Sequence, residues 1–273
     1  MKIAQFIDKD RIRLGLILEE GLQPVDFDGD MIDFLKNGGP VQPFGPALAL
    51  SEVKLAPPVS RPSKIIAIGL NYLDHAAEGK TKAPKVPLIF AKFSNSIIGF
   101  GDTIIWCDKI TRKVDFEAEL AVVIGKKIHN CPEEKALGAV FGYTCANDVS
   151  ARDLQFGDGQ WVRGKSLDTF CPIGPWIVNS EEISDPQCLK IESRLNGEVM
   201  QSSNTENMIF PVSFLVSFMS RHFTLFPGDL ILTGTPSGVG TFREPAVYMK
   251  DGDKIVVSIE KIGNLKNQCR VIF

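Results

Sequence analysis

Three acidic residues in one short stretch offer the chemistry most easily recognised in this sequence. Asp115, Glu117 and Glu119 alternate with other residues ahead of the run Leu-Ala-Val-Val-Ile (120–124). An apolar, β-branched run of this kind is typical of a buried strand. Because strand side chains alternate between faces, we expect the three carboxylates on one face. Their repulsion would be relieved either by a bound cation or by solvation at an exposed strand end.

The ligand types narrow the choice of cation. Only oxygen donors are present in this stretch, without a neighbouring His or Cys. Hard cations such as Mg²⁺, Mn²⁺ or Ca²⁺ prefer oxygen ligands, whereas a structural zinc site does not fit. Asp148 lies near the end of a second expected strand (140–149) and is a natural third ligand. The pattern predicts a metal site and leaves the solvated strand end as an equal alternative.

His75 and Glu78 form a second candidate group. They are three residues apart in an expected short helix that Asn71 could cap. On a helix they share a face, so Glu78 could orient the imidazole as a general base. A surface histidine beside a glutamate is the simpler interpretation of the pair alone. The loop that follows, 80–87, could act as a lid.

Residues 159–166 match the phosphate-binding pattern G-x-x-x-x-G-K-[ST], with Lys165 in the lysine position. The match is interpreted as chance, because Cys171-Pro172 follows where that pattern requires a long helix. Lys165 then faces an anionic ligand or lies on the surface. Arg152 and Gln155 share a face of an expected turn or short helix, where surface or salt-bridge roles are the simplest interpretation. The glycine-rich stretch 233–240 is equally typical of a ligand-binding loop and of a plain turn.

The composition sets the class of protein. The chain has 273 residues, a formal net charge of −3 and an ordinary balance of apolar and charged residues. This charge favours neither a nucleic acid nor an anionic membrane as partner, and no apolar run is long enough to span a bilayer. The six cysteines form no C-x-x-C pair, and the first residues lack a signal-peptide pattern. We therefore expect reduced, structural cysteines in a cytoplasmic protein.

The elements that must position these residues are mainly strands. A small β-rich domain is expected over 1–58, beginning with a hairpin and ending in a proline-rich linker, and a larger domain over 59–273. The larger domain should contain an apolar helix near 210–219. The last strand is expected at 254–259.

Five phrases in this chain occur in the order found in one enzyme family. They are Gly-Leu-Asn-Tyr-x-x-His-x-x-Glu (69–78), Asp-Phe-Glu-x-Glu-Leu (115–120), Asn-Asp-Val-Ser-Ala-Arg-Asp-x-Gln (147–155), Gly-Lys-Ser-x-Asp-Thr-Phe (164–170) and Leu-Thr-Gly-Thr-Pro-x-Gly-Val-Gly (232–240). Over about residues 60–271 the chain resembles the fumarylacetoacetate hydrolase family. The stretches 201–205 and 240–243 are most similar to the fumarylacetoacetate hydrolase domain-containing protein 2 branch.

The resemblance implies a fold, an assembly and roles for the residues above. The fold would be mixed α/β but mainly β, a mixed β-roll or sandwich behind the small N-terminal domain, in a homodimer with a Mg²⁺ or Mn²⁺ site. Matched position by position, the metal ligands would be Glu117, Glu119 and Asp148, with no role for Asp115. His75 and Glu78 would activate water or move a proton, and Lys165 would neutralise negative charge beside the metal. The implied substrate-binding residues are Tyr72, Arg152, Gln155 and Thr235.

The implied substrate is a small 2-oxo or β-diketo acid that chelates the metal, which stabilises the enolate. Hydrolysis of a C–C bond in an acylpyruvate-like acid is the function expected first. Tautomerisation or decarboxylation of oxaloacetate, or a related isomerisation, proceeds through the same enolate and is the alternative. A catalytically silent metal-binding protein is a third interpretation, against which the presence of His75 and Glu78 counts.

Overall fold

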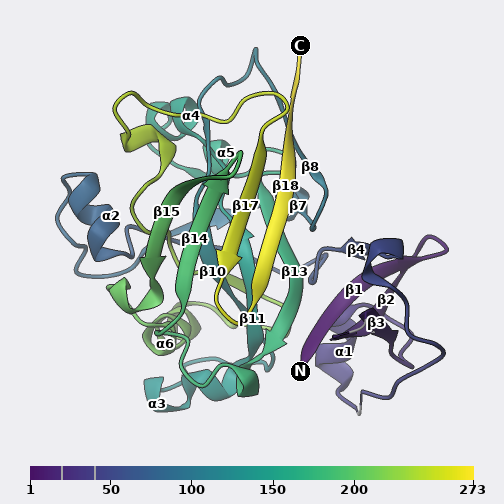
Figure 1. Ribbon diagram of the computed structural model, residues 1–273. Helices are drawn as coiled ribbons and strands as arrows, with labels where there is room; N and C mark the ends of the chain where they lie inside the picture. Colours follow the sequence, from purple (N-terminus) through teal and green to yellow (C-terminus); the bar gives the residue numbers. More distant parts are fainter. Residues whose placement is uncertain (20, 40) are drawn as a thin grey trace.

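Strands dominate the computed structural model, which describes residues 1–273 except 20 and 40 (Figure 1). The larger sheet runs in the order β3-β2-β1-β13-β11-β10-β16-β5-β6, with β4 paired to β1 and β7 to β13. Its strands are β1 (Lys2–Asp8), β2 (Arg11–Leu18), β3 (Gly21–Pro24), β4 (Lys54–Ala56), β5 (Ile65–Gly69), β6 (Leu88–Lys92), β7 (Ile97–Ile98), β10 (Ala118–Ile124), β11 (Val140–Asn147), β13 (Cys171–Asn179) and β16 (Leu230–Leu232).

A second sheet has the order β15-β14-β17-β18-β8, and β12 pairs with β9 in a separate two-stranded ribbon. These strands are β8 (Thr103–Cys107), β9 (Val114–Asp115), β12 (Ser150–Ala151), β14 (Lys190–Leu195), β15 (Glu198–Asn204), β17 (Lys254–Ile259) and β18 (Gly263–Ile272). The helices are α1 (Met31–Asn37), α2 (Leu73–Glu78), α3 (Glu133–Ala136), α4 (Arg152–Gly157), α5 (Val162–Lys165) and α6 (Val212–His222). The mixed, mainly β fold expected from the sequence is confirmed.

The strand β10 lies at the centre of the molecule and is buried along its whole length. Leu120 and Val122 pack in one core cluster with residues of β17, β18 and α6. Ala121 and Val123 belong to a second cluster, which includes residues of α1. Burial on both faces explains why the sequence of this strand is apolar without interruption.

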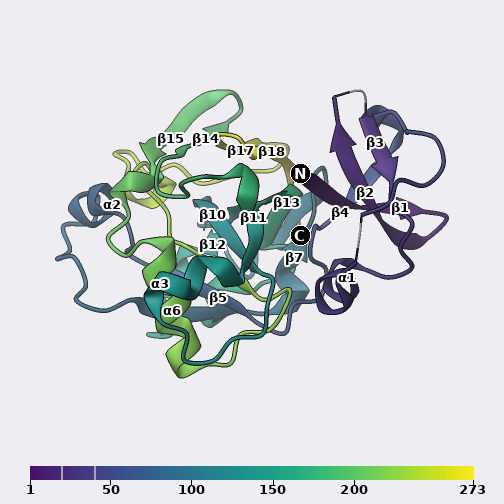
Figure 2. The ribbon, with the colours of Figure 1, turned by 90° about the horizontal axis from the view of Figure 1, so that it is seen from below.

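The segment that carries β1 to β4 and α1 gathers on one side of the molecule (Figures 1 and 2). The expected hairpin is confirmed, since β1 pairs antiparallel with β2. The strand β1 also pairs with β13, placing Lys2 opposite Val178 and Ile3 opposite Ile177. The first strand therefore extends the large sheet of the rest of the chain. The division into domains at residue 58 stays a prediction.

The expectation that Asp115, Glu117 and Glu119 share one face of a strand is wrong. Phe116 and Glu117 leave the ladder between β9 and β10. The Phe116 N–H donates to the carboxylate of Asp115, and the Glu117 N–H donates to the side-chain oxygen of Asn147. Because these side chains replace the strand partners, Asp115 does not continue the face on which Glu117 and Glu119 lie.

Two further expectations are corrected. The strand β17 is followed by β18, in which Leu265, Asn267 and Cys269 are buried and the residues between them are exposed. Asn71 does not cap α2, because its amide donates to Thr233 O and its side-chain oxygen accepts from Phe210 N–H. The residue at the N-terminal cap is Tyr72, which makes no side-chain capping bond.

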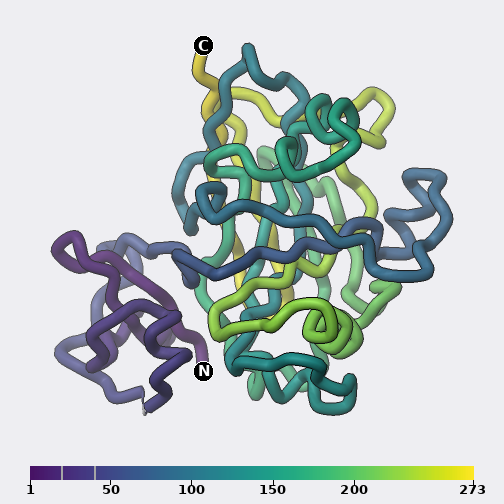
Figure 3. Tube along the Cα trace, turned by 180° about the vertical axis from the view of Figure 1, so that it is seen from behind, coloured from purple at the N-terminus to yellow at the C-terminus, as the bar shows by residue number. Residues whose placement is uncertain are grey.

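The helix α2 and the loop after it project from one side of the molecule (Figures 1 and 3). The expected helix near 210–219 is confirmed as α6, and its buried residues pack in the main core cluster. Within the described residues, no helix combines the length and apolar composition needed to cross a membrane.

Candidate active site

Glu117, Glu119 and Asp148 converge in space. Each offers an oxygen within 4.8 Å of the other two. The antiparallel register of β10 and β11 places Ala118 opposite Asn147, and the Asp148 N–H donates to Glu117 O at 2.9 Å. The three residues are at most 6% exposed, so the alternative of a solvated strand end is excluded.

Three buried cations neutralise part of this acidic group. Lys165 Nζ donates to Glu117 at 2.7 Å and to Asp148 at 2.8 Å. Arg152 Nη1 lies 2.6 Å from Glu117, and Lys92 Nζ lies 2.6 Å from Asp148. Lys92 was not predicted from the sequence. The feature that could have indicated its role is a lysine in the otherwise apolar strand Leu-Ile-Phe-Ala-Lys (88–92).

The carboxylates differ in how far neighbouring cations neutralise their negative charge. Burial alone would raise the pKa of Glu117, but Lys165 and Arg152 outweigh it and lower that pKa to about 2. Burial raises the pKa of Glu119, and the charges of Asp148 and Glu117 raise it further. Glu119 accepts a hydrogen bond from Gly234 N–H at 2.7 Å and forms no ion pair within the described part of the chain. Glu119 is therefore the carboxylate that lacks a cation.

The residues present fit a hard divalent cation. The buried group contains four carboxylates and three basic side chains: Asp115, Glu117, Glu119 and Asp148 against Lys92, Arg152 and Lys165. Among the described residues the Tyr72 hydroxyl, also buried, has no hydrogen-bond partner. Burial raises the pKa of Tyr72, and the charge of Glu119 raises it further. An oxygen-ligated cation would neutralise the excess negative charge beside Glu119.

His75 and Glu78 form a positioned pair on α2. His75 Nδ1 lies 3.2 Å from one Glu78 carboxylate oxygen, and the other oxygen accepts from Gly238 N–H at 2.9 Å. His75 is 7% exposed and its ring lies 5.7 Å from that of Phe242. A surface histidine is therefore excluded. Because Glu78 holds Nδ1, the imidazole is oriented with Nε2 free for a proton.

Arg152 and Gln155 share a face of α4, as expected, but they are buried rather than on the surface. Arg152 Nη1 donates to Gln155 Oε1 at 2.9 Å, and Arg152 Nε donates to Asp115 at 2.8 Å. Arg152 Nη2 is buried without a partner among the described residues. This nitrogen is the donor that remains for a ligand.

Asp115, which the resemblance gave no role, connects Arg152 to the glycine-rich segment. Its carboxylate accepts from Gly240 N–H at 2.8 Å and from Thr241 N–H at 2.9 Å, in addition to the bond from Arg152. Asp115 has no exposed surface. Its bonds position Arg152, and Asp115 is not among the three carboxylates that converge within 4.8 Å of one another.

A cavity of about 180 Å³ lies over this group. Its polar lining consists of His75, Glu117, Arg152, Gln155, Lys165, Thr81 and Thr235, and its aromatic lining consists of Phe90, Phe156, Trp161 and Phe242. The cavity is thus lined by residues from all five sequence phrases. Glu119 and Asp148 complete the group of converging carboxylates with Glu117 but do not line the cavity.

Two of the predicted substrate-binding residues, Tyr72 and Thr235, are poorly placed to contact a substrate. Tyr72 is fully buried and is not among the residues that line the cavity. Thr235 lines the cavity, but its hydroxyl donates to Ala118 O at 2.9 Å and accepts from Gln201 Nε2 at 2.7 Å. Its hydroxyl hydrogen is therefore already used inside the protein.

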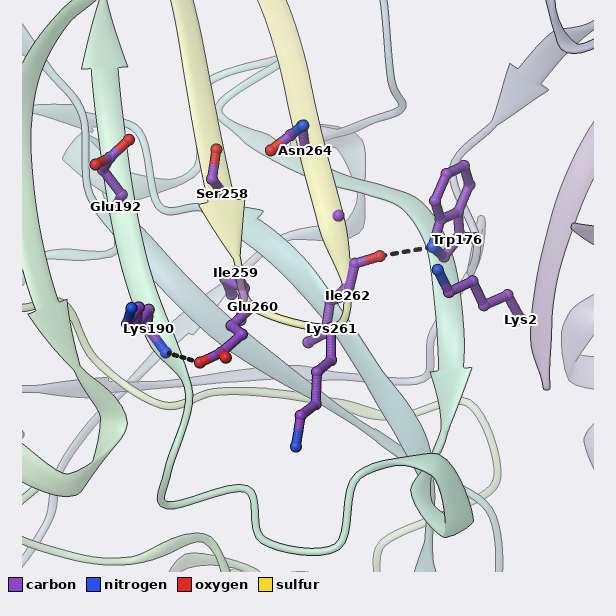
Figure 4. Close-up of a pocket in the computed structure, with 11 residues that line it drawn as sticks. Lys2, Trp176, Lys190, Glu192, Ser258, Ile259, Glu260, Lys261, Ile262 and Asn264 are labelled. Carbon is purple, nitrogen blue, oxygen red and sulfur yellow. Dashed lines mark hydrogen bonds between the residues drawn. The ribbon is translucent and has the colours of Figure 1, made fainter. Parts of the chain in front are cut away.

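A more open hollow of about 500 Å³ lies elsewhere, where Lys2 approaches Trp176 beside the turn between β17 and β18 (Figure 4). Trp176 Nε1 donates to Ile262 O at 2.8 Å, which fixes the indole at its edge. None of the residues that line this hollow belongs to the acidic group. The chemistry is therefore located in the smaller cavity.

Comparisons with known proteins identify the family of the chain. Residues 64–270 match the family described as fumarylacetoacetate (FAA) hydrolase C-terminal. The chain is 48% identical over 224 residues to the mitochondrial oxaloacetate tautomerase Fahd2a of Rattus norvegicus, which covers 82% of this chain and 71% of the relative. A fumarylacetoacetate hydrolase from Exiguobacterium antarcticum matches over 100% of both chains at 39% identity, with a TM-score of 0.91. A 2-hydroxyhepta-2,4-diene-1,7-dioate isomerase from Mycobacterium marinum matches at 35% identity over 99% of this chain and 98% of its own, with a TM-score of 0.84.

Proposed function

The chain belongs to the fumarylacetoacetate hydrolase family, and from this membership we propose that it is an oxaloacetate tautomerase. The observation that carries the proposal is the His75–Glu78 pair at the wall of a small cavity that also contains Glu117, Arg152 and Lys165. A base beside groups that bind anions is suited to moving a proton on a small 2-oxo acid. The name of the rat relative gives the same activity for that protein.

Glu117, Glu119 and Asp148 would hold the divalent cation, for which Mg²⁺ or Mn²⁺ is proposed and Ca²⁺ is a possible substitute. When bound, the cation would act as a Lewis acid that polarises the 2-oxo group of the substrate. The free Nη2 of Arg152 would bind a substrate carboxylate. The ammonium of Lys165, held by Glu117 and Asp148, would stabilise negative charge on the oxygen at C2.

The proposed proton transfer uses Nε2 of His75. In the keto-to-enol direction the C3–H bond of oxaloacetate breaks, and its proton passes to Nε2 while Glu78 keeps Nδ1 protonated. The electron pair of that bond forms the C2–C3 double bond, and the carbonyl oxygen at C2 takes a proton from solvent. The imidazolium then returns its proton to solvent, so that atoms and charge balance. The enol-to-keto direction is the reverse of these steps.

The C–C hydrolase expected first from the sequence is the competing function. It would need the same His75–Glu78 pair to deprotonate a water molecule instead of carbon. The comparisons favour the alternative, because the rat relative is named a tautomerase and a similar solved structure is named an isomerase. The homodimer and the cytoplasmic location stay predictions, and the rat relative is itself named mitochondrial.

The test is an NMR assay of the purified protein with Mg²⁺, run in parallel on oxaloacetate and on acetylpyruvate. Faster enol–keto exchange of oxaloacetate, with acetylpyruvate unchanged, is the expected result. Release of acetate and pyruvate from acetylpyruvate would instead establish the hydrolase, and CO₂ from oxaloacetate the decarboxylase. Exchange that persists after complete removal of divalent cations with EDTA would contradict the proposed use of the acidic group.

A further inference from the structure

We propose that Trp161 sets the length of the 2-oxo acid that the cavity accepts, restricting it to short acids such as a four-carbon diacid. This inference rests on the proposed function and adds the size class of its substrate. The cavity of about 180 Å³ has a neighbouring hollow of about 390 Å³. Both are lined by Phe90 and Trp161. These two rings are therefore the wall between the cavity and the hollow.

The Trp161 ring is fixed by close packing. It lies against Gly69 at the end of β5, where an added Cβ would come within 2.6 Å of the Trp161 ring. On another side it meets Phe90 edge to face, with ring centres 5.3 Å apart. Gly69 thus provides the space that the indole occupies, and a ring packed in this way forms a rigid wall.

The wall is connected to the reacting groups through the chain. Trp161 is the residue before α5, and its carbonyl oxygen accepts the N–H of Lys165 at 3.0 Å. Lys165 Nζ in turn lies 5.1 Å from the centre of the Phe90 ring. One turn of helix therefore fixes the distance between Trp161 in the wall and Lys165 at the anion-binding end of the cavity.

The division of the lining into polar and aromatic residues decides where a long substrate would extend. Charged groups of Glu117, Arg152 and Lys165 lie at the polar part of the lining, whereas Trp161 and Phe90 are aromatic. A substrate whose carboxylate and 2-oxo group bind the charged side chains would direct any longer acyl chain toward the rings. A volume of about 180 Å³ is small beside the roughly 300–1,000 Å³ of typical small-molecule sites. Such a space suits a short acid and excludes a long acyl chain.

Beyond the wall, the neighbouring hollow offers the room that a longer substrate would need. Its lining includes Leu88 and Ile89 of β6. Removal of the indole would join it to the cavity and provide an apolar channel. Because a single apolar pocket contact changes discrimination by about 10-fold or more, the joined cavity should bind a long analogue about tenfold more tightly.

The experiment measures binding rather than turnover, with oxamate as the short probe and N-hexyl oxamate as the long probe. Calorimetry in the presence of Mg²⁺ would compare the wild type with Trp161→Ala and Trp161→Leu. Trp161→Phe is the matched control that keeps a ring at the wall. Trp176→Leu removes a tryptophan remote from the cavity. Melting curves identify variants that fold, and the leucine variant provides a second test if the alanine variant does not.

The expected result is a preference of the wild type for oxamate that falls about tenfold or more in Trp161→Ala and Trp161→Leu. Trp161→Phe should stay closer to the wild type, and Trp176→Leu should match it. An unchanged ratio of the two affinities in a folded Trp161 variant would overturn the inference. So would an equal loss of affinity for both probes, which indicates a structural role alone.

The outcome for the proposed function is separate. If the wild type turned over neither oxaloacetate nor acetylpyruvate while the affinity ratio changed as expected, the function would fail and the role of Trp161 would stand. If oxaloacetate were tautomerised while the ratio stayed constant, the function would stand and the role of Trp161 would fail.

Discussion

Two of the three guanidinium nitrogens of Arg152 have partners in the buried site, and Asp115 provides one of them. The Asp115 carboxylate also holds the N–H groups of Gly240 and Thr241. Charge-assisted hydrogen bonds of this kind are strong and directional. Asp115 therefore fixes the direction of Nη2 without contacting a ligand itself.

Replacement of this carboxylate should affect substrate binding first. In Asp115→Asn, the amide cannot replace a charged acceptor, so Arg152 should lose its fixed orientation. We expect kcat/KM for oxaloacetate to fall about 10- to 100-fold, mainly through KM, as the loss of a charged hydrogen bond implies. Asp229→Asn is the control, because Asp229 is equally buried but bonds to Ser63, Lys64 and Phe226 N–H. Steady-state kinetics showing a raised KM in both variants would contradict the specific role of Asp115.

Substitutions in the acidic group and in the His75–Glu78 pair should have different effects on Mg²⁺ binding and on turnover. Glu117→Ala removes an expected ligand and should abolish Mg²⁺ binding in a calorimetric titration. His75→Ala should bind Mg²⁺ as the wild type does, with turnover reduced about 10²- to 10⁴-fold, the usual contribution of a general base. Equal loss of Mg²⁺ binding in the two variants would refute the division of roles.

Residue spacing grouped Glu117 and Glu119 with Asp115 and offered Asp148 as a further ligand, whereas the resemblance gave the set Glu117, Glu119 and Asp148 that converges in the structure. The rule that alternate residues share a face holds for Glu119 onward, within β10. It fails at Asp115, because Phe116 and Glu117 exchange their ladder bonds for side-chain partners. Lys92 could not be assigned, since its role depends on Asp148, which is distant in the sequence.

At the scale of elements, one irregular segment after β16 supports both halves of the site. Gly238 N–H holds Glu78, while Gly240 N–H and Thr241 N–H hold Asp115. Gly234 N–H holds Glu119. The glycine-rich pattern of this segment is equally typical of a plain turn, because the contacts that matter are made by its backbone N–H groups.

A single methyl group should disturb this segment. In Gly240→Ala the added Cβ would lie 1.8 Å from Val247 O and 2.7 Å from an Asp115 carboxylate oxygen, so the backbone must shift. We expect a fall in kcat/KM of about tenfold or more, together with a lower melting temperature. Gly138→Ala is the matched control, since nothing lies within 4 Å of its added Cβ. Activity and melting temperature of Gly240→Ala equal to those of Gly138→Ala would contradict this account.

Element prediction succeeded where hydrophobic patterns were strong and failed where polar residues fill a strand. The helix α6 and the central strand β10 follow from apolar runs. The strand β18 was missed because its buried positions include Asn267, whose amide donates to Gly99 O and Asp102 O. The pairing of β18 with β8 is parallel and joins residues far apart in the chain, which local patterns do not reveal.

At the scale of the whole molecule, the N-terminal segment is joined to the rest by the pairing of β1 with β13. Ile3 and Leu14 belong to the same core cluster as Ile173 and Ile177 of β13. Removal of residues 1–58 would expose this cluster. We expect the remaining chain to melt on the order of 10 °C lower, as a loss of about 3 kcal/mol implies for a domain of this size. An unchanged melting temperature would show that the larger domain is stable alone.

The burial of cysteines gives a second test of the whole fold. Burial raises the pKa of Cys145 and of Cys171 to about 12, so almost no thiolate is present at pH 8. Cys188 is exposed. Alkylation at pH 8 followed by mass spectrometry should label the exposed Cys188 first and leave Cys145 and Cys171 unlabelled until the protein unfolds. Labelling of Cys145 at the rate of Cys188 in the native protein would contradict the fold.

The position of β18 inside its sheet has a consequence for biosynthesis. Since β18 lies between β17 and β8, the strand β8 has no partner in this sheet until residues 263–272 have left the ribosome. The strand β8 is therefore synthesised about 160 residues before its partner β18, at a rate of about 5–20 residues per second. During this interval β8 is unpaired in the nascent chain and accessible to chaperones. Ribosome-bound chains stalled before Gly263 should be cleaved by protease near β8, and chains extended beyond Ile272 by a linker should resist cleavage there.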